Sequence, residues 1–177
     1  TVAKLMYTKS YDRLIEVHKK LIDENLFHKI FIFGIGEEKD VLQKKIDEYG
    51  LHDTFILAGF KNNPYKYINK CDIYVCSSRR EGFSTAVTEA LILGKPVVST
   101  NCSGSYELLG YNNEYGIVVE NSTKGIYDGL KLLLKDPLLV EKYRKKAIIR
   151  GKKFTKQVVI KQNKEIFDNI LKGDIND

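Results

Sequence analysis

Short apolar runs alternate with longer amphipathic runs along almost the whole chain, and this alternation constrains the fold more than any other feature. The short runs are rich in β-branched residues, as in Lys29–Phe33, whereas the long runs repeat apolar residues at helical spacing, as in Asp12–Asn25. Strands that alternate with helices form right-handed βαβ units and a parallel sheet, and continuous apolar strands indicate a sheet covered on both faces. We therefore expect an α/β fold with a doubly wound parallel sheet.

The elements expected from this pattern are bounded by glycine, proline and polar residues. The expected strands are Val2–Met6, Lys29–Phe33, Thr54–Ala58, Ile73–Cys76, Pro96–Thr100 and Gly116–Glu120. The expected helices are Asp12–Asn25, Glu37–Tyr49, Pro64–Lys70, Thr85–Leu93, Thr123–Leu134, Pro137–Gly151 and Val158–Leu171. Ligands of such sheets bind beyond the carboxyl ends of the strands. The loops where a site is expected are Met6–Ser10, Gly34–Glu38, Ala58–Asn63, Ser77–Ser84 and Asn101–Glu107.

Composition excludes several classes of protein. A chain of 177 residues that is 43% hydrophobic and 29% charged suits one folded domain rather than a disordered segment. No apolar run approaches the roughly 20 residues of a membrane-spanning helix. The three cysteines and three histidines lack the spacing of zinc ligands. The odd number of cysteines, with no closely spaced pair, argues for a reducing compartment. The chain begins abruptly, without a methionine or a secretory signal, and we expect it to be a fragment of a longer protein.

The net charge of +6 is spread along the chain and is densest in Lys142–Lys164. Solvated helix faces account for such a pattern, and contact with an anionic membrane or with nucleic acid would account for it as well. We expect no nucleic-acid partner, because the sequence has no helix-turn-helix or aromatic-basic RNA-binding motif.

The segment Ser78–Ala90 is the strongest candidate for chemistry, because it follows a buried strand and opens a helix. Ser84 is a suitable N-cap, and the unpaired amides of the first helical turn favour an anion such as a phosphate. Glu81 lies just before this helix and Glu89 lies more than a turn inside it. Carboxylates accept strong hydrogen bonds from sugar hydroxyls. The alternative is that Glu81 is a surface residue and that Glu89 pairs with a lysine.

Glu81 and Glu89 enclose seven residues, as in an E-x7-E motif. Around them stand Gly82-Phe83-Ser84, Thr88-Glu89-Ala90 and Gly94-Lys95-Pro96-Val97-Val98. In this composite motif the chain resembles the retaining glycosyltransferases of family 4, the glycosyl transferases group 1. The resemblance extends to Val2–Leu5, Lys9–Ile15, Gly34–Gly36, Leu57–Phe60, Ser103–Glu107 and Gly116–Val119. Ala3, Ser10 and Ser103 depart from it, because they stand where the family has glycine.

The resemblance implies a binding site for a nucleotide diphosphate sugar. Lys9 would contact the diphosphate, together with Lys4 in the place of a family arginine, and both would stabilise the leaving nucleotide. Glu81 would lie at the sugar hydroxyls and the reaction centre, and Glu89 would bind the ribose. The other expected donor contacts are Gly82, Phe83, Ser84 and Thr85 at the helix start, Gly34 and Gly36, and Phe60 near the base.

The resemblance also implies an architecture. Residues 1–152 would form the Rossmann-like donor-binding half of a two-domain GT-B enzyme, and residues 153–177 a C-terminal helix that crosses back to an N-terminal domain outside the chain. Such an enzyme transfers a sugar to an acceptor hydroxyl with anomeric retention. We expect a glycan or lipid-linked acceptor in bacterial surface polysaccharide or glycoconjugate synthesis, a UDP-sugar donor, no cofactor and no metal. We also expect a cytoplasmic location with peripheral contact at the inner face of the membrane, and little activity in the isolated chain.

Other interpretations stay open. A non-catalytic nucleotide-sugar-binding module would have lost one of Lys9, Glu81 and Glu89, and none is lost. A basic module that contacts a membrane or polymer would gather Lys142–Lys164 on one face. Gly34-Ile35-Gly36 supports dinucleotide binding only weakly, because Lys39 stands in the place of the third glycine. Arg79 and Arg80 could contact phosphate, an acidic partner or only solvent.

Overall fold

A computed structural model describes residues 1–172 of the chain, and residues 173–177, the end of the expected C-terminal helix, lie outside the described part. The strands are β1 Ile30–Ile32, β2 Phe55–Leu57, β3 Tyr74–Cys76, β4 Val97–Thr100 and β5 Ile117–Val119. The helices are α1 Tyr11–Asp23, α2 Lys39–Glu48, α3 Tyr65–Ile68, α4 Thr85–Ile92, α5 Ser105–Leu109, α6 Thr123–Lys135, α7 Pro137–Gly151 and α8 Lys156–Lys172, with 3₁₀ turns η1 Tyr7–Lys9 and η2 Lys152–Phe154.

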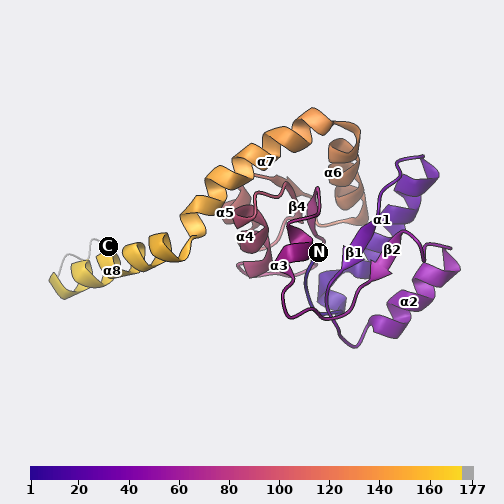
Figure 1. The fold of residues 1–177 in the computed structure, drawn as a ribbon, viewed down its shortest axis with the longest axis horizontal. Coiled ribbons are helices and arrows are strands. Elements are labelled where there is room, and N and C mark those ends of the chain that lie inside the picture. The colour runs from indigo at the N-terminus through magenta and orange to yellow at the C-terminus, as the bar shows by residue number, and fades with distance from the viewer. Residues whose placement is uncertain (173–177) are drawn as a thin grey trace.

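The sheet is parallel, as expected, but it is hydrogen-bonded in two separate ladders. One ladder pairs β1 with β2, and the other has the order β3-β4-β5 (Figure 1). Helices cover both faces. α1, α2 and α6 share one core with Val75, Val98 and Ile117, whereas α4, α5 and α7 share the other core with Tyr74 and Val97. The doubly wound α/β fold is therefore confirmed.

The expected strand Val2–Met6 is wrong, because only an isolated bridge between Val2 and Phe33 forms there. Residues 1–5 run along the chain after β1, and the amide of Ala3 donates to the carbonyl of Phe33 at 3.2 Å. On the other side a side chain replaces a strand partner: the Tyr74 hydroxyl accepts from the Val2 amide at 3.2 Å and donates to its carbonyl at 3.4 Å. We call the contact between the two ladders, made by residues 1–5 and η1 with Tyr74 and residues 77–79, the seam.

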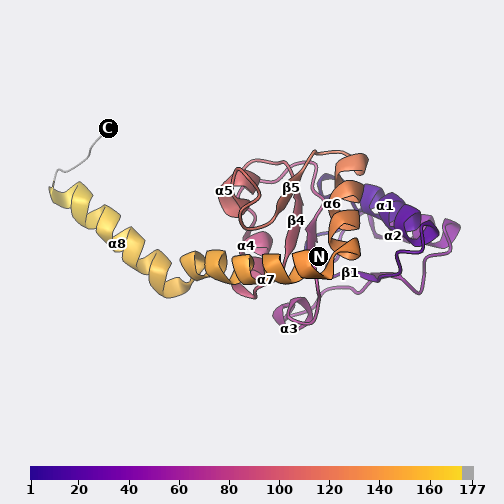
Figure 2. The same cartoon turned by 90° about the horizontal axis from the view of Figure 1, so that it is seen from above.

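The last helices leave the sheet. α7 packs on α4, and α8 contacts η2 and extends away from the α/β body in two perpendicular views (Figures 1 and 2). Apolar side chains of α8 such as Ile160 and Phe167 are exposed, and so are most lysines of Lys142–Lys164. None of the described helices combines the length and apolar character needed to cross a membrane.

Candidate functional site

The loop after β3 is hydrogen-bonded along its length to the η1 turn. The three carbonyls of η1 all accept from residues 77–79. The Tyr7 carbonyl accepts from the Arg79 guanidinium at 2.9 Å, the Thr8 carbonyl from the Arg79 amide at 2.7 Å, and the Lys9 carbonyl from the Ser77 hydroxyl at 2.8 Å. These bonds bring a basic turn from the β1–β2 side of the sheet to the carboxyl end of β3.

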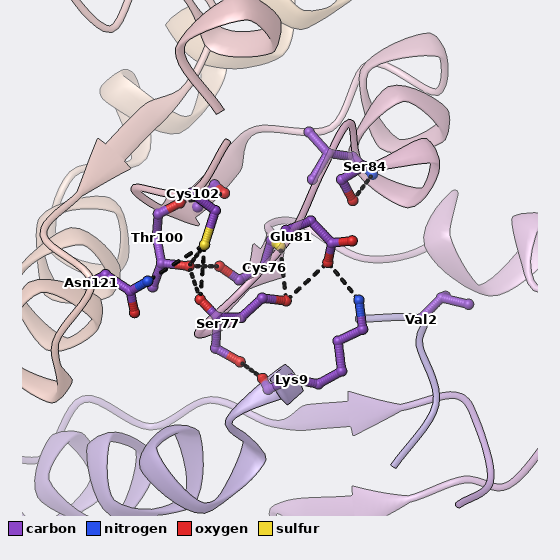
Figure 3. Close-up of polar contacts among 12 residues, drawn as sticks. Val2, Lys9, Cys76, Ser77, Glu81, Ser84, Thr100, Cys102 and Asn121 are labelled. Atoms are coloured by element: carbon purple, nitrogen blue, oxygen red, sulfur yellow. Dashed lines mark hydrogen bonds and ion pairs between the residues drawn. The ribbon is translucent and has the colours of Figure 1, made fainter. Parts of the chain in front are cut away.

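Lys9 and Glu81 meet at this place, as Figure 3 shows. The Lys9 Nζ lies 2.5 Å from Glu81 Oε2, and both side chains are only 20% exposed. The Ser78 hydroxyl donates to the same Oε2 at 3.0 Å. A half-buried ion pair with an additional hydrogen bond has a better-defined geometry than an exposed pair. The interpretation of Glu81 as an isolated surface residue is therefore wrong.

Side chains at and after the ends of β4 and β5 support this loop from the side opposite Lys9, at the left of Figure 3. The Thr100 hydroxyl donates to the Ser78 carbonyl at 2.6 Å, and the Cys102 thiol donates to the same oxygen at 3.2 Å. The Asn121 amide group donates to the Arg79 carbonyl at 2.9 Å. Burial raises the pKa of the Cys102 thiol, which keeps it protonated as a donor. The main-chain carbonyls of Ser78 and Arg79, shortly before Glu81, are therefore satisfied by one buried and two half-buried side chains.

The helix after Glu81 begins as the sequence predicts. Ser84 is the N-cap of α4, and its hydroxyl accepts from the Val87 amide at 3.4 Å. The loop between β4 and α5 packs closely against Gly82, since a Cβ on Gly104 would lie 3.0 Å from the Gly82 carbonyl. The space beside Gly82 itself is open. The amino end of α4 thus faces the site with its free amides.

A cleft of about 320 Å³ lies between residues 1–9 and the start of α4. This volume falls in the range of small-ligand pockets. The predicted site residues that line the cleft are Lys4, Lys9, Glu81, Phe83, Ser84 and Thr85. Gly82 lies between two of them in the chain, whereas Gly34, Gly36, Phe60 and Glu89 are outside the lining. The structure therefore brings together the residues predicted for the diphosphate and the sugar.

Glu89 lies outside the lining of the cleft, and its partner is a tyrosine rather than a lysine. Its Oε1 accepts a hydrogen bond from the Tyr65 hydroxyl of α3 at 3.1 Å, so its pairing with a lysine is wrong. This bond raises the pKa of Tyr65. Phe60, in the loop before α3, is 64% exposed. This side of α4 is more open to solvent than the Lys9–Glu81 side.

Gly34 and Gly36 have a packing role that the sequence did not indicate. A Cβ on Gly34 would lie 1.9 Å from the Ala3 carbonyl oxygen, and one on Gly36 would lie 2.1 Å from the Leu5 carbonyl oxygen. Only glycine lets the two chain segments approach so closely. These residues pack the chain after β1 against residues 1–5 and do not form the wall of the cleft.

Several residues of the site were missed or left undecided by sequence reasoning. The Arg79 guanidinium pairs with both carboxylate oxygens of Asp12, at 2.9 and 2.7 Å. This pairing excludes the alternative that Arg79 contacts only solvent. Burial opposes ionisation of Asp12, but the Arg79 hydrogen bonds keep its pKa below the usual value. Arg13 donates to Ser10 Oγ and to Asn121 Oδ1, each at 2.9 Å. Ser10 has φ +57°, which explains why glycine suits this position in the family.

The chain resembles known proteins over most of its length. It is 37% identical over 158 residues to the N-acetylgalactosamine-N,N'-diacetylbacillosaminyl-diphospho-undecaprenol 4-alpha-N-acetylgalactosaminyltransferase of Campylobacter jejuni, an alignment that covers 88% of this chain and 42% of that enzyme. It is 26% identical over 147 residues to the poly(ribitol-phosphate) alpha-N-acetylglucosaminyltransferase of Staphylococcus aureus, with 82% and 30% covered. The chain thus spans less than half the length of these relatives.

Solved structures agree in fold. A mutant of Staphylococcus aureus TarM in complex with fondaparinux, α-GlcNAc-glycerol and UDP has a TM-score of 0.83 at 25% identity, covering 94% of this chain and 34% of that chain. The C-terminal domain of the glycosyl transferase group 1 protein LpcC from Francisella tularensis has a TM-score of 0.76 at 23% identity, with 86% and 83% covered. The family model for "Glycosyl transferases group 1" matches residues 1–154. The chain therefore belongs to the glycosyl transferases group 1.

Proposed function

We propose that this chain is the donor-binding half of a retaining glycosyltransferase, which moves a sugar from a nucleotide diphosphate sugar to an acceptor hydroxyl in bacterial polysaccharide or glycoconjugate synthesis. The observation that carries the proposal is the Lys9–Glu81 pair, a cation and a carboxylate 2.5 Å apart in a cleft beside the start of α4. The names of the two relatives, which specify diphospho-undecaprenol-linked and poly(ribitol-phosphate) acceptors, support a glycan or lipid-linked acceptor. The acceptor would bind a second domain outside this chain.

Positive charge in the cleft would serve the diphosphate. Lys9 and Lys4 both line it, and the amides at the start of α4 add the positive end of a helix dipole. These groups stabilise the nucleotide diphosphate as negative charge develops on it during departure. Because Lys9 already pairs with Glu81, an incoming diphosphate shares a lysine that the protein has oriented beforehand.

Glu81 would act on the sugar. Its Oε2 is used by Lys9 and Ser78, so its Oε1 is the oxygen that can accept from sugar hydroxyls. A carboxylate there also stabilises the oxocarbenium character expected in glycosyl transfer. Retention would follow from front-face attack, in which the leaving phosphate accepts the proton of the acceptor hydroxyl. Glu81 then positions and stabilises the sugar and is not a nucleophile.

The nucleoside would extend along α4 from the cleft towards α3. Glu89 would accept from the ribose hydroxyls, and Phe60 would lie beside the base. UDP is the favoured nucleotide, since the structural neighbour TarM was crystallised with UDP.

Calorimetry of the 177-residue chain with UDP, GDP and ADP tests the proposal. We expect weak binding of UDP and little turnover without the acceptor half. Glu89→Ala should weaken UDP binding about tenfold, because a charge-assisted hydrogen bond to the ribose is lost. Glu48→Ala, an exposed site on α2, is the matched control and should leave affinity unchanged. Absence of binding to all three nucleotides would contradict the donor-domain function.

A further inference from the structure

Arg79 is a charged side chain of the seam whose guanidinium makes several contacts within the chain. Its guanidinium makes two hydrogen bonds to the Asp12 carboxylate, at 2.9 and 2.7 Å, and a third to the Tyr7 carbonyl at 2.9 Å. Its central carbon also lies 4.1 Å from the centroid of the Tyr7 ring. Two-pronged pairing with a carboxylate fixes both the distance and the plane of a guanidinium. The orientation of Arg79 is therefore set by α1 and η1, before any ligand arrives.

The η1 turn depends on these polar contacts for its position. None of its three residues is buried, and the Tyr7 side chain is exposed, so apolar packing contributes little to holding it. The chain after it enters α1 through Ser10 in the left-handed conformation, which most residues avoid. Its three carbonyls are instead bonded by Arg79 and Ser77. A short exposed turn of this kind keeps one conformation only while such bonds are intact.

Lys9 is the last residue of this turn, and Glu81 lies two residues after Arg79 in the loop that holds the turn. A shift of η1 would move Lys9 Nζ, whereas Glu81 would stay with the loop and with its support from Ser78 and Thr100. The separation between the cation and the carboxylate therefore depends in part on the guanidinium of Arg79 and its contact with Asp12, which lie outside the lining of the cleft.

We propose that Arg79, anchored by Asp12, is a positioning residue that holds the Lys9 turn at the donor diphosphate. The proposal rests on the proposed function for the identity of the ligand, and on the described contacts alone for the anchoring of η1. It also assigns different tasks to two neighbouring arginines. Arg79 is paired with Asp12 and bonded to Tyr7, whereas Arg80 is exposed and is a matched control of the same charge.

Hydrogen–deuterium exchange tests the anchoring without any ligand. The amides of Lys9 and Ser10 donate within the turn, to the carbonyls of Met6 and Tyr7, so their exchange reports its order. In Arg79→Ala we expect these two amides to exchange at least about tenfold faster, while amides of α4 stay protected. Arg80→Ala should change neither. Unchanged exchange in Arg79→Ala, in a variant whose unfolding curve shows that it is folded, would overturn the proposal.

A double-mutant cycle on UDP affinity tests the positioning. Arg79→Ala should weaken UDP binding about five- to tenfold, and Asp12→Asn somewhat less. If Arg79 acts through Lys9, the pair Arg79→Ala with Lys9→Ala should bind UDP no more weakly than Lys9→Ala alone. Additive losses would overturn the proposal, because they would make Arg79 a phosphate contact in its own right or a purely structural residue. If the unaltered chain binds no nucleotide but the turn loosens in Arg79→Ala, the anchoring stands and the proposed function falls.

Discussion

The two ladders of the sheet differ in what they bury and in what they give to the site. The β1–β2 ladder packs on α1 around His18, a polar ring with no exposed surface, and it supplies the lysine turn. The β3–β4–β5 ladder has a fully buried central strand and supplies Glu81 and the start of α4. Main-chain hydrogen bonds form each ladder, whereas the two ladders are joined by a shared apolar core and by the seam, in which a main-chain bond from Arg79 to Thr8 accompanies side-chain contacts. The geometry of the Lys9–Glu81 pair therefore depends on the seam as well as on the shared core.

The largest expected effect is where residues 1–5 lie closely against the chain after β1. Gly36→Ala places a Cβ 2.1 Å from the Leu5 carbonyl oxygen, so residues 1–5 must move. We expect a loss of about 3 kcal/mol or more in the free energy of unfolding by urea, because overpacking against main chain cannot be relieved by a rotamer change. Gly82→Ala, where the space is open, should stay within about 0.5 kcal/mol. Equal stability of the two variants would show that residues 1–5 do not pack as described.

A smaller effect is expected from the arginine of α1 that reaches the second ladder. Arg13 donates to Asn121 and, at 3.4 Å, to the Ser77 carbonyl. Arg13→Ala should cost about 2 kcal/mol in urea unfolding, because hydrogen bonds from a charged donor are lost and partly buried acceptors are left without it. Lys19→Ala on the same helix removes only an exposed pair with Asp23 and should cost less than about 0.5 kcal/mol. Similar losses in the two variants would show that the bonds from Arg13 to Ser77 and Asn121 do not stabilise the contact between the ladders.

Acid should weaken the first ladder. His18 Nδ1 lies 2.9 Å from His28 Nε2, and its Nε2 lies 2.9 Å from Thr54 Oγ1. Burial, with a smaller contribution from His28, lowers the pKa of His18 to about 3. The unfolded chain, whose histidine pKa is about 6.5, binds the proton first, so stability is complete above that pH and is lost as the pH falls towards the folded value. We expect about 1 to 2 kcal/mol less stability at pH 5 than at pH 7.

Histidine NMR titration provides the check on this acid effect. The ring signals of His18 should not titrate above pH 5. His52→Gln, a substitution at an exposed histidine, is the control and should leave urea unfolding at pH 7 unchanged. Titration of His18 at an ordinary pH would refute the buried neutral ring.

The smallest expected effect is at the hydroxyl that replaces a strand partner. Tyr74→Phe removes the hydrogen bonds to the Val2 main chain and should cost about 1 kcal/mol in urea unfolding. Tyr49→Phe, a more exposed tyrosine of the first half, should have no measurable effect. If Tyr74→Phe leaves the free energy of unfolding unchanged, residues 1–5 are held only by their hydrogen bonds to the chain after β1.

The sequence located β1 to β5 closely, because each strand is a short apolar run between glycine or polar residues. It failed where an element lacks a pattern of its own. Val2–Met6 has strand composition but finds a tyrosine hydroxyl where a partner strand would be, and α5, with five residues, is too short to show helical periodicity. The 3₁₀ turn at Lys9 was expected only as a loop, since its hydrogen bonds come from residues about 70 positions away.

The residues of the site likewise divide into those that a local pattern predicts and those that depend on long-range contacts. Ser84 as an N-cap and Glu81 beside the helix start were predictable because they lie on one local segment, and Lys9 followed from the family resemblance, whereas the role of Glu89 stays a prediction. The pairing of Arg79 with Asp12 and of Arg13 with Asn121 was not predictable, since these partners are 67 and 108 residues apart and the chain has 29 basic residues that could compete. Tyr65 was missed because a tyrosine in a short amphipathic helix gives no sign that its hydroxyl faces a carboxylate.

The thiol of Cys102 offers a consequence for experiment that follows from its position. It donates to the Ser78 carbonyl, and burial raises its pKa, so little of the reactive thiolate exists at neutral pH. Its alkylation by a maleimide would therefore be slow in the intact protein and would accelerate when the support beneath Glu81 opens. The rate of labelling at this native cysteine would measure the opening of the site directly, with no ligand and no engineered probe.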